Sequence, residues 1–170
     1  MAATYRVDVF HGSSPVAAAW VDGGRFHRAD TSPTTDGSTT YLPVPLTGIA
    51  YSWRKHFKVN FLTAPVGSIS NLRFFSDGAS WGAGITAFAK KDSAYTQGSS
   101  ADNAAQLSGS VDVTTYTSSV PLTITAGTVL SNPAVGYGTQ DYLVMQVGGG
   151  PAVAAGSTTP RTLSFRFDET

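Results

Sequence analysis

Hydrophobic and polar residues alternate with a period of two along much of this chain, which is the pattern of strands with one buried face. In the segment KHFKVNF, residues 55–61, Phe57, Val59 and Phe61 point to one face and the residues between them are polar. Similar alternation, or a short apolar run, predicts further strands at residues 4–10, 69–75, 84–90, 120–125, 141–147 and 161–170. Because Gly, Pro, Asn and Asp separate these segments and no convincing helical period is present, the pattern predicts an all-β sandwich or barrel.

Two long polar stretches, residues 11–45 and 91–119, interrupt the predicted strands. Loops of this length are uncommon in a compact domain unless they have a function of their own. We expect both to be loop or arm regions. We expect residues 91–119 to be dispensable for folding, because Tyr95 and Leu107 are the main apolar anchors there. No internal repeat or linker divides the chain, so residues 1–170 are predicted to form a single domain.

The segment YSWRKHFKVNF, residues 51–61, combines aromatic rings with cations, as surfaces that bind single-stranded nucleic acid do. Such a surface needs its rings and cations on the same face. The alternation instead sends Phe57 and Phe61 to the face opposite His56 and Lys58. We therefore expect a central strand whose rings build the core and whose cations meet solvent or an acidic neighbour.

The composition narrows the range of partners. Only 13% of the 170 residues are charged, and the eleven cations balance the eleven anions, so no basic field attracts nucleic acid. A surface this poor in charge is unusual for a free monomer, and it favours either a subunit that packs against neighbours or simply a Ser/Thr-rich β domain. The sequence has no Cys, no signal-peptide pattern at its start and no long apolar run. We expect a soluble protein made in a cytoplasm, with no membrane partner.

Catalytic and cofactor signatures are missing from the sequence. His27 lies near Asp22 and Asp30, but no G-x-S-x-G nucleophile elbow accompanies this pair, and three separate His make a poor metal set. GAGITA, residues 82–87, matches a dinucleotide fingerprint by letter but enters a strand rather than a helix. Glu169 is the only Glu, and most Asp residues stand in turn contexts. We predict no enzyme, no catalytic residue, no metal site and no cofactor, although loop carboxylates leave calcium binding open.

Four aromatic residues are the candidates for an interface. Trp20, Phe26 and Tyr41 belong to the segment 11–45, in which four prolines prevent a continuous central strand. Tyr95 is the corresponding ring in the second polar stretch. Large rings dominate protein interfaces, so we expect these residues to contact a second copy or another protein.

From about Tyr51 to its end, the chain resembles a family of small all-β virion proteins of tailed bacteriophages. The features that carry the resemblance are SWRKHFKVNF with Trp53, then ISNLRFF and a Gly-rich turn, then DYLVMQV, and finally TLSFRFDET. They cover about two thirds of the chain. The resemblance implies a single antiparallel β-sandwich, jelly-roll-like and with long loops, located in the virion. It implies no active site.

The resulting expectation is a non-enzymatic decoration or cement protein that binds and stabilises the exterior of a tailed-phage capsid. Its partners would be the major capsid protein or other virion proteins, together with further copies of itself, and neither nucleic acid nor membrane. The alternative is a binding module of a tail, neck or fibre that recognises a carbohydrate or host surface, with Trp20, Trp81 and the loop tyrosines as stacking platforms. A small hydrolase is the weakest alternative, since neither nucleophile nor base is found.

Overall fold

The structure is a computed structural model, and it describes residues 2–20, 26–31, 41–132, 134–154 and 161–170. The described part consists of short strands, two 3-10 helices and connecting loops. In chain order the elements are β1 (Tyr5–His11), β2 (Val16–Ala19), β3 (Ala50–Tyr51), β4 (Lys55–Phe61), β5 (Ser68–Ser76), β6 (Ile85–Asp92), η1 (Ser100–Asn103), β7 (Val111–Asp112), η2 (Val113–Thr115), β8 (Leu122–Ser131), β9 (Tyr142–Gly149) and β10 (Leu163–Glu169).

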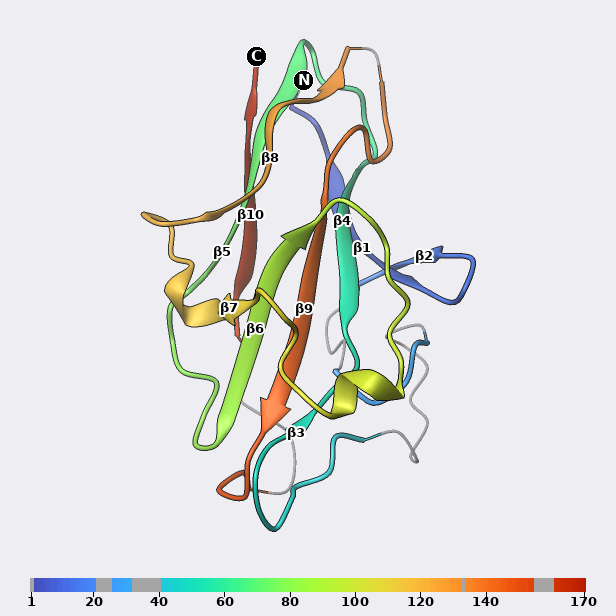
Figure 1. The fold of residues 1–170 in the computed structure, drawn as a ribbon. Coiled ribbons are helices and arrows are strands. Elements are labelled where there is room, and N and C mark those ends of the chain that lie inside the picture. The colour runs from blue at the N-terminus through green and yellow to red at the C-terminus, as the bar shows by residue number, and fades with distance from the viewer. Residues whose placement is uncertain (1, 21–25, 32–40, 133, 155–160) are drawn as a thin grey trace.

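Two antiparallel sheets pack face to face, which confirms the predicted all-β sandwich (Figure 1). The larger sheet has the order β2-β1-β4-β9-β6-β7, with β3 paired to β9, and the smaller sheet has the order β10-β5-β8. From β4 onward the long strands alternate between the sheets, so that each connection crosses the sandwich. This alternation is the jelly-roll-like feature of the fold.

The core lies between the two sheets and is built from the inward positions of the alternating strands. Val59, Phe61, Ile69, Leu72 and Phe74 are fully buried in it. Val59 and Phe61 stand at positions predicted to point inward, and the other three belong to a segment predicted as a strand. Side chains at alternate positions of a regular strand point to one face, as Val59 and Phe61 do. On β5 an irregularity between Ile69 and Leu72 changes the alternation, so these two residues, three apart, both reach the core.

Strands β9 and β10 are buried as their sequence patterns predict. Strand β9, predicted as an apolar run buried on both faces, is buried from Leu143 to Gly149. Strand β10 places Leu163, Phe165 and Phe167 against the core, as its alternation predicts. The ring of Phe167 contacts Phe61 at a centroid distance of 5.1 Å. The last strand therefore closes the small sheet over the centre of the large one.

The expectation that the cations of residues 51–61 meet solvent is wrong for two of the polar positions of β4. Lys55 and His56 are each only 1% exposed. His56 points to the outer face of the large sheet, where Tyr95 lies over it at a ring distance of 4.8 Å. Lys55 shares the inward side with Phe57 at the end of the sandwich, where Nζ donates to the carbonyl of Ala29 at 2.7 Å. Alternation with a period of two predicts which face of the sheet a side chain occupies. It does not predict whether other parts of the chain cover that face.

The two long polar stretches contain ordered elements as well as loops. Strand β2 lies within residues 11–45, and η1, β7 and η2 lie within residues 91–119. The second stretch crosses the outer face of the large sheet (Figure 1). Leu107 is 6% exposed there and Val113 is fully buried. The expectation that this stretch offers little to the fold is therefore corrected.

No helix in the described ranges is long and apolar enough to cross a membrane.

Candidate functional site

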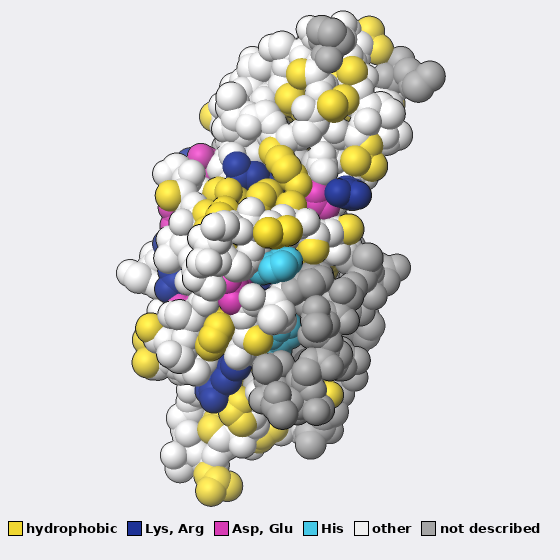
Figure 2. All heavy atoms as spheres, turned by 90° about the vertical axis from the view of Figure 1, so that its right-hand side faces the viewer, with side chains coloured by type: hydrophobic (Ala, Val, Ile, Leu, Met, Phe, Trp, Pro, Cys, Tyr) yellow, Lys and Arg dark blue, Asp and Glu magenta, His cyan; other side chains and the backbone are white. Residues whose placement is uncertain are grey.

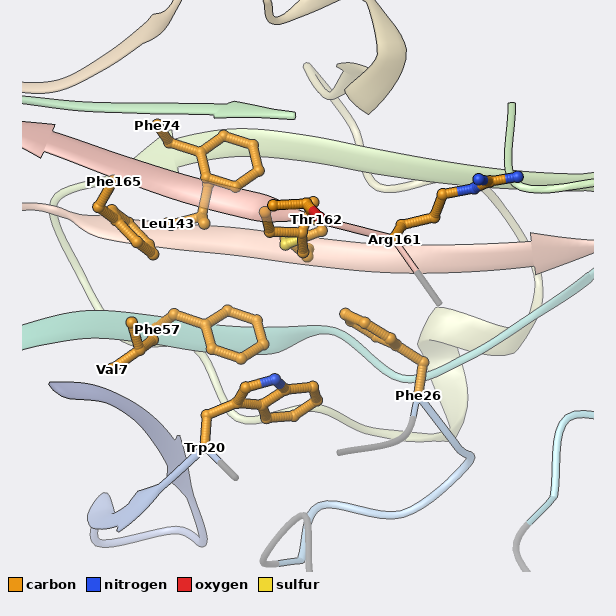
Figure 3. A pocket seen from close by; sticks show the side chains of 11 residues that line it. Val7, Trp20, Phe26, Phe57, Phe74, Leu143, Arg161, Thr162 and Phe165 are labelled. Carbon is orange, nitrogen blue, oxygen red and sulfur yellow. The ribbon is translucent and has the colours of Figure 1, made fainter. Parts of the chain in front are cut away.

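Trp20 and Phe26, two of the predicted interface residues, meet in a hollow of about 360 Å³ between the two sheets (Figure 3). We call this site the apolar hollow. Its floor is buried and consists of Phe57, Phe74, Leu143 and Met145. Its rim is partly exposed and consists of Val7, Trp20, Phe26, Arg161, Thr162, Leu163 and Phe165.

The rings of the apolar hollow hold one another in place. The ring of Trp20 stands edge-on to Phe57, with the centroids 5.0 Å apart and the planes at 83°. Phe26 lies 5.7 Å from Trp20 and 6.2 Å from Phe57. On the opposite side, Phe165 contacts Phe74 at 5.6 Å. Tilted and edge-on pairs of this kind are favourable beyond the area they bury.

The polar groups of the apolar hollow are few. Thr162 supplies a hydroxyl at the start of β10. Arg161 extends from the end of the hollow away from the rings (Figure 3). Its Nε atom is buried and has no hydrogen-bond partner among the residues described. Among the described residues that line it, aromatic and aliphatic side chains dominate, so the hollow suits the binding of an apolar group.

The outer face of the large sheet is a second place where polar residues gather, and residues 93–110 close it. The side-chain amide of Gln146, on β9, accepts from the N–H of Leu107 at 2.7 Å and donates to the carbonyls of Asp102 and Ser52 at 2.9 and 3.1 Å. Asp102, on η1, accepts from Arg54 Nε at 2.8 Å and forms an ion pair with its guanidinium. These buried bonds attach the polar stretch to the sheet.

His56 is the buried histidine of this face. Its Nε2 accepts from the N–H of Thr96 at 3.3 Å, and its ring contacts those of Tyr95 and Tyr142, which also contact each other. Burial, together with the positive charge of Arg54, lowers the pKa of His56 from 6.5 to about 4. The imidazole is therefore neutral near pH 7 and serves as a hydrogen-bond acceptor inside the structure.

Tyr95, the fourth predicted interface residue, is occupied within the chain. Its hydroxyl donates to the carbonyl of Gly12 at 3.0 Å and lies 3.3 Å from Asp30 Oδ2. Asp30 also accepts from the N–H of Gly12 at 2.7 Å. Burial and the Asp30 carboxylate raise the pKa of Tyr95. Tyr95 thus joins the loops after β1 and β6, and it does not present its ring as a separate contact surface.

Lys55 is the other buried cation of interest, because burial lowers its pKa to about 8 and the nearby Asp30 only partly opposes that shift. Its Nζ donates to the carbonyls of Ala29 and Thr31 at 2.7 and 3.3 Å. A catalytic lysine needs access to a substrate, whereas this ammonium is enclosed and already donates to backbone carbonyls. We interpret Lys55 as the group that fixes residues 29–31 to β4.

Large apolar side chains are exposed at both ends of the elongated molecule. At the end that holds the termini, Leu62, Val66 and Val135 are 50%, 65% and 58% exposed. We call these three residues the terminal patch. The side-chain amide of Asn132 donates to the carbonyl of Val66 at 2.7 Å, and Phe61 pairs with Gly136, so the two loops lie side by side. On the face in Figure 2 this end shows hydrophobic and uncharged atoms, with charged side chains below it.

The opposite end carries the segment YLPVPLTGI, residues 41–49. Its exposed apolar residues are Tyr41, Val44, Leu46 and Ile49 at 54%, 45%, 96% and 52%. The predicted interface residue Tyr41 is therefore on the surface, while Trp20 and Phe26 form the apolar hollow. Nothing in the alternation pointed to the terminal patch, because its residues lie in turns rather than strands. Their exposure depends on the packing of two loops.

Within the described ranges, no three His, Cys, Asp or Glu residues lie close enough together to hold a metal ion. Asp22, the other possible partner of His27 in the sequence, lies outside the described residues. Comparisons with protein-family models, with curated proteins and with solved structures found no match to this chain.

Proposed function

We propose that this chain is a non-enzymatic virion structural protein that attaches to the exterior of a tailed-bacteriophage capsid as a decoration or cement protein. The observation that carries the proposal is the terminal patch, where Leu62, Val66 and Val135 are exposed together. Neither residues 62–68 nor residues 131–138 contain a charge. One charge lies beside the patch, because the carboxylate of Glu169 accepts from the N–H of Val66 at 3.4 Å. Exposed apolar side chains with polar or charged groups at their edge are typical of a protein-binding site.

The shape of the molecule supports the same proposal. The terminal patch lies at one end of an elongated sandwich (Figure 1), so an upright subunit can contact a flat protein surface through it. Each contact of this size is weak, and many copies on a symmetric shell stabilise it collectively. The partner we propose is the major capsid protein or another virion protein, and the place of action is the virion after synthesis in the host cytoplasm.

The carbohydrate-binding alternative has less support. A stacking platform for a sugar needs an exposed ring face, but Trp20 and Trp81 are both partly buried and packed against the core. These two tryptophan rings are therefore used for folding, whereas the loop residue Tyr41 is 54% exposed. A glycan array with purified protein tests this alternative directly, and binding of a defined glycan would favour a tail or fibre module over capsid decoration.

Co-sedimentation with capsids prepared without this protein tests the proposal. Val66→Asp places a charge in the terminal patch, and we expect at least about tenfold weaker retention, since burying one valine is worth on the order of 1.5 kcal/mol and a buried carboxylate costs more. The matched control is Val120→Asp, because Val120 is 64% exposed, like Val66 at 65%, and stands in a loop before β8. Failure of the wild-type protein to sediment with capsids, or equal retention of both variants, would contradict the proposal.

A further inference from the structure

The segment YLPVPLTGI, residues 41–49, is an exposed apolar segment with unused backbone groups. Val44 is 45% exposed and Leu46 is 96% exposed, and the segment contains no charge. No hydrogen bond joins residues 41–47 to the described part of the chain. Such a segment is costly to leave in water and is available to pair with another strand.

Because Pro43 and Pro45 are two residues apart, only one edge of this segment can donate backbone hydrogen bonds. Both rings fix φ, and each biases the residue before it toward an extended conformation. In an extended chain the N–H groups of alternate residues point to opposite edges. The edge of Pro43 and Pro45 therefore lacks donors, whereas Val44 and Leu46 present N–H and C=O groups to the other edge. The side chains of Val44 and Leu46 also share one face.

Strand β10 offers a matching free edge. It is the outermost strand of the small sheet and pairs only with β5. The N–H of Asp77 donates to the carbonyl of Thr162 at 3.2 Å, so the residues that bond to β5 are Thr162 and every second residue after it. Leu163 and Phe165 therefore direct their N–H and C=O groups away from β5. No partner for these groups is found in the described ranges.

The apolar hollow lies beside that edge. Leu163 and Phe165 belong to its rim, and Trp20 and Phe26 stand on the other side (Figure 3). A strand added to β10 would place residues opposite Leu163 and Phe165 with their side chains on the same inward face. In the added strand, the two residues whose backbone groups bond to β10 would therefore also be the two whose side chains face the hollow. Val44 and Leu46 satisfy both conditions.

We propose that residues 43–46 of one copy add as a short strand to β10 of a second copy, with Val44 and Leu46 entering its apolar hollow. The occupant is a second copy because the donor segment and the acceptor strand are both present on this chain, and neither has a backbone partner at these positions in the described ranges. The hollow that receives the segment is apolar except for Thr162 and Arg161, and Arg161 extends away from the rings (Figure 3). Since the donor end and the acceptor strand differ, the contact is heterologous and joins copies head to tail into rings or rows. This inference goes beyond capsid attachment and does not require it.

Site-specific cross-linking tests the contact, and the absence of Cys from the chain makes every introduced thiol unique. One preparation carries Leu46→Cys and a second, with a size tag, carries Leu163→Cys on the rim of the apolar hollow, the face of β10 that the added strand would share. Mixing and mild oxidation should give a heterodimer that is at least about tenfold more abundant than with Leu62→Cys in place of Leu46→Cys. Leu62 is 50% exposed and belongs to the terminal patch, so it controls for chance collision. Equal yields would overturn the proposal.

Sedimentation velocity over a concentration series gives the second measurement. The wild-type protein should self-associate, and Leu46→Asp should weaken this association by about tenfold or more while leaving the circular dichroism unchanged. A wild-type protein that stays monomeric, or a Leu46→Asp variant that associates as well as the wild type, would overturn the proposal. The wild-type protein could instead be monomeric while Leu46→Asp is retained less well on capsids. In that case the segment binds another virion protein and not a second copy. That result would leave the proposed function standing.

Discussion

Single residues of strand β4 show how the setting of a side chain decides its role. His56 belongs to a polar face by its position in the alternation, yet it is 1% exposed because Tyr95 and Tyr142 cover it. Its neutral form accepts a hydrogen bond from Thr96. A protonated imidazole has no lone pair for that bond, so acid opposes the native arrangement.

A pH dependence of stability follows from His56. Its pKa is about 4 in the folded chain and 6.5 when unperturbed, so between these values the unfolded chain binds more protons. The stability that the neutral imidazole contributes is complete above pH 6.5 and is lost as the pH falls toward 4. We expect the free energy of unfolding to decrease by about 3 kcal/mol across this window, measured by urea titration at several pH values.

His56→Gln keeps an acceptor for Thr96 without a titrating group, and it should remove most of this decrease. His11→Gln, which changes a half-buried histidine at the end of β1, is the control and should keep the wild-type decrease. An unchanged pH profile in His56→Gln would show that other groups cause the effect.

At the scale of elements, residues 91–119 act as a cover for the large sheet rather than as a free arm. Gln146 is 1% exposed in the middle of β9, and its amide bonds to four backbone groups of this cover and its neighbourhood. An apolar residue at this position would leave the N–H of Leu107 and the carbonyls of Ser52 and Asp102 buried without partners. Unsatisfied buried groups of this kind are costly.

Gln146→Leu should therefore lower the free energy of unfolding by about 2 to 4 kcal/mol, measured by urea titration. Gln106→Leu is the matched control, because Gln106 is exposed and its amide bonds only to Ser110 within the same loop. Replacement of residues 93–110 by a Gly/Ser linker should destabilise the protein more strongly than Gln146→Leu. Unchanged stability after that replacement would show that the cover contributes nothing to folding.

For the whole molecule, the two sheets share one core. Phe61 and Leu143 of the large sheet and Ile69 and Phe74 of the small sheet belong to one buried cluster. Neither sheet can bury its inner face without the other. Low charge and exposed apolar side chains at both ends are the features of the surface on which the proposed association depends.

Unfolding should accordingly be a single cooperative transition. Far-ultraviolet circular dichroism follows the strands, and tryptophan fluorescence follows Trp20, Trp53 and Trp81, which lie in different loops around the core. The two signals should give the same urea midpoint and slope. Separate transitions would show that part of the chain, such as the segment around Trp20, folds independently of the sandwich.

The sequence by itself determined the strands and their inward faces. The period of two in residues 55–61 and 163–167 is a property of the extended backbone, so it is visible locally and correctly places Phe57, Val59 and Phe165. It also indicated that Trp20 and Phe26 are unusual rings in a polar stretch. The resemblance added the sandwich architecture, and the structure confirms that architecture.

Only the tertiary structure decided what covers each face and which rings meet. Gln146 and Leu107 are bonded although 39 residues separate them, and Trp20 contacts Phe57 across two strands. No local pattern encodes such contacts, because they depend on sheet order and on the path of the loops. The same reason explains why Lys55 and His56 are buried. The apolar hollow and the free edge of β10 exist only where strands distant in sequence lie side by side.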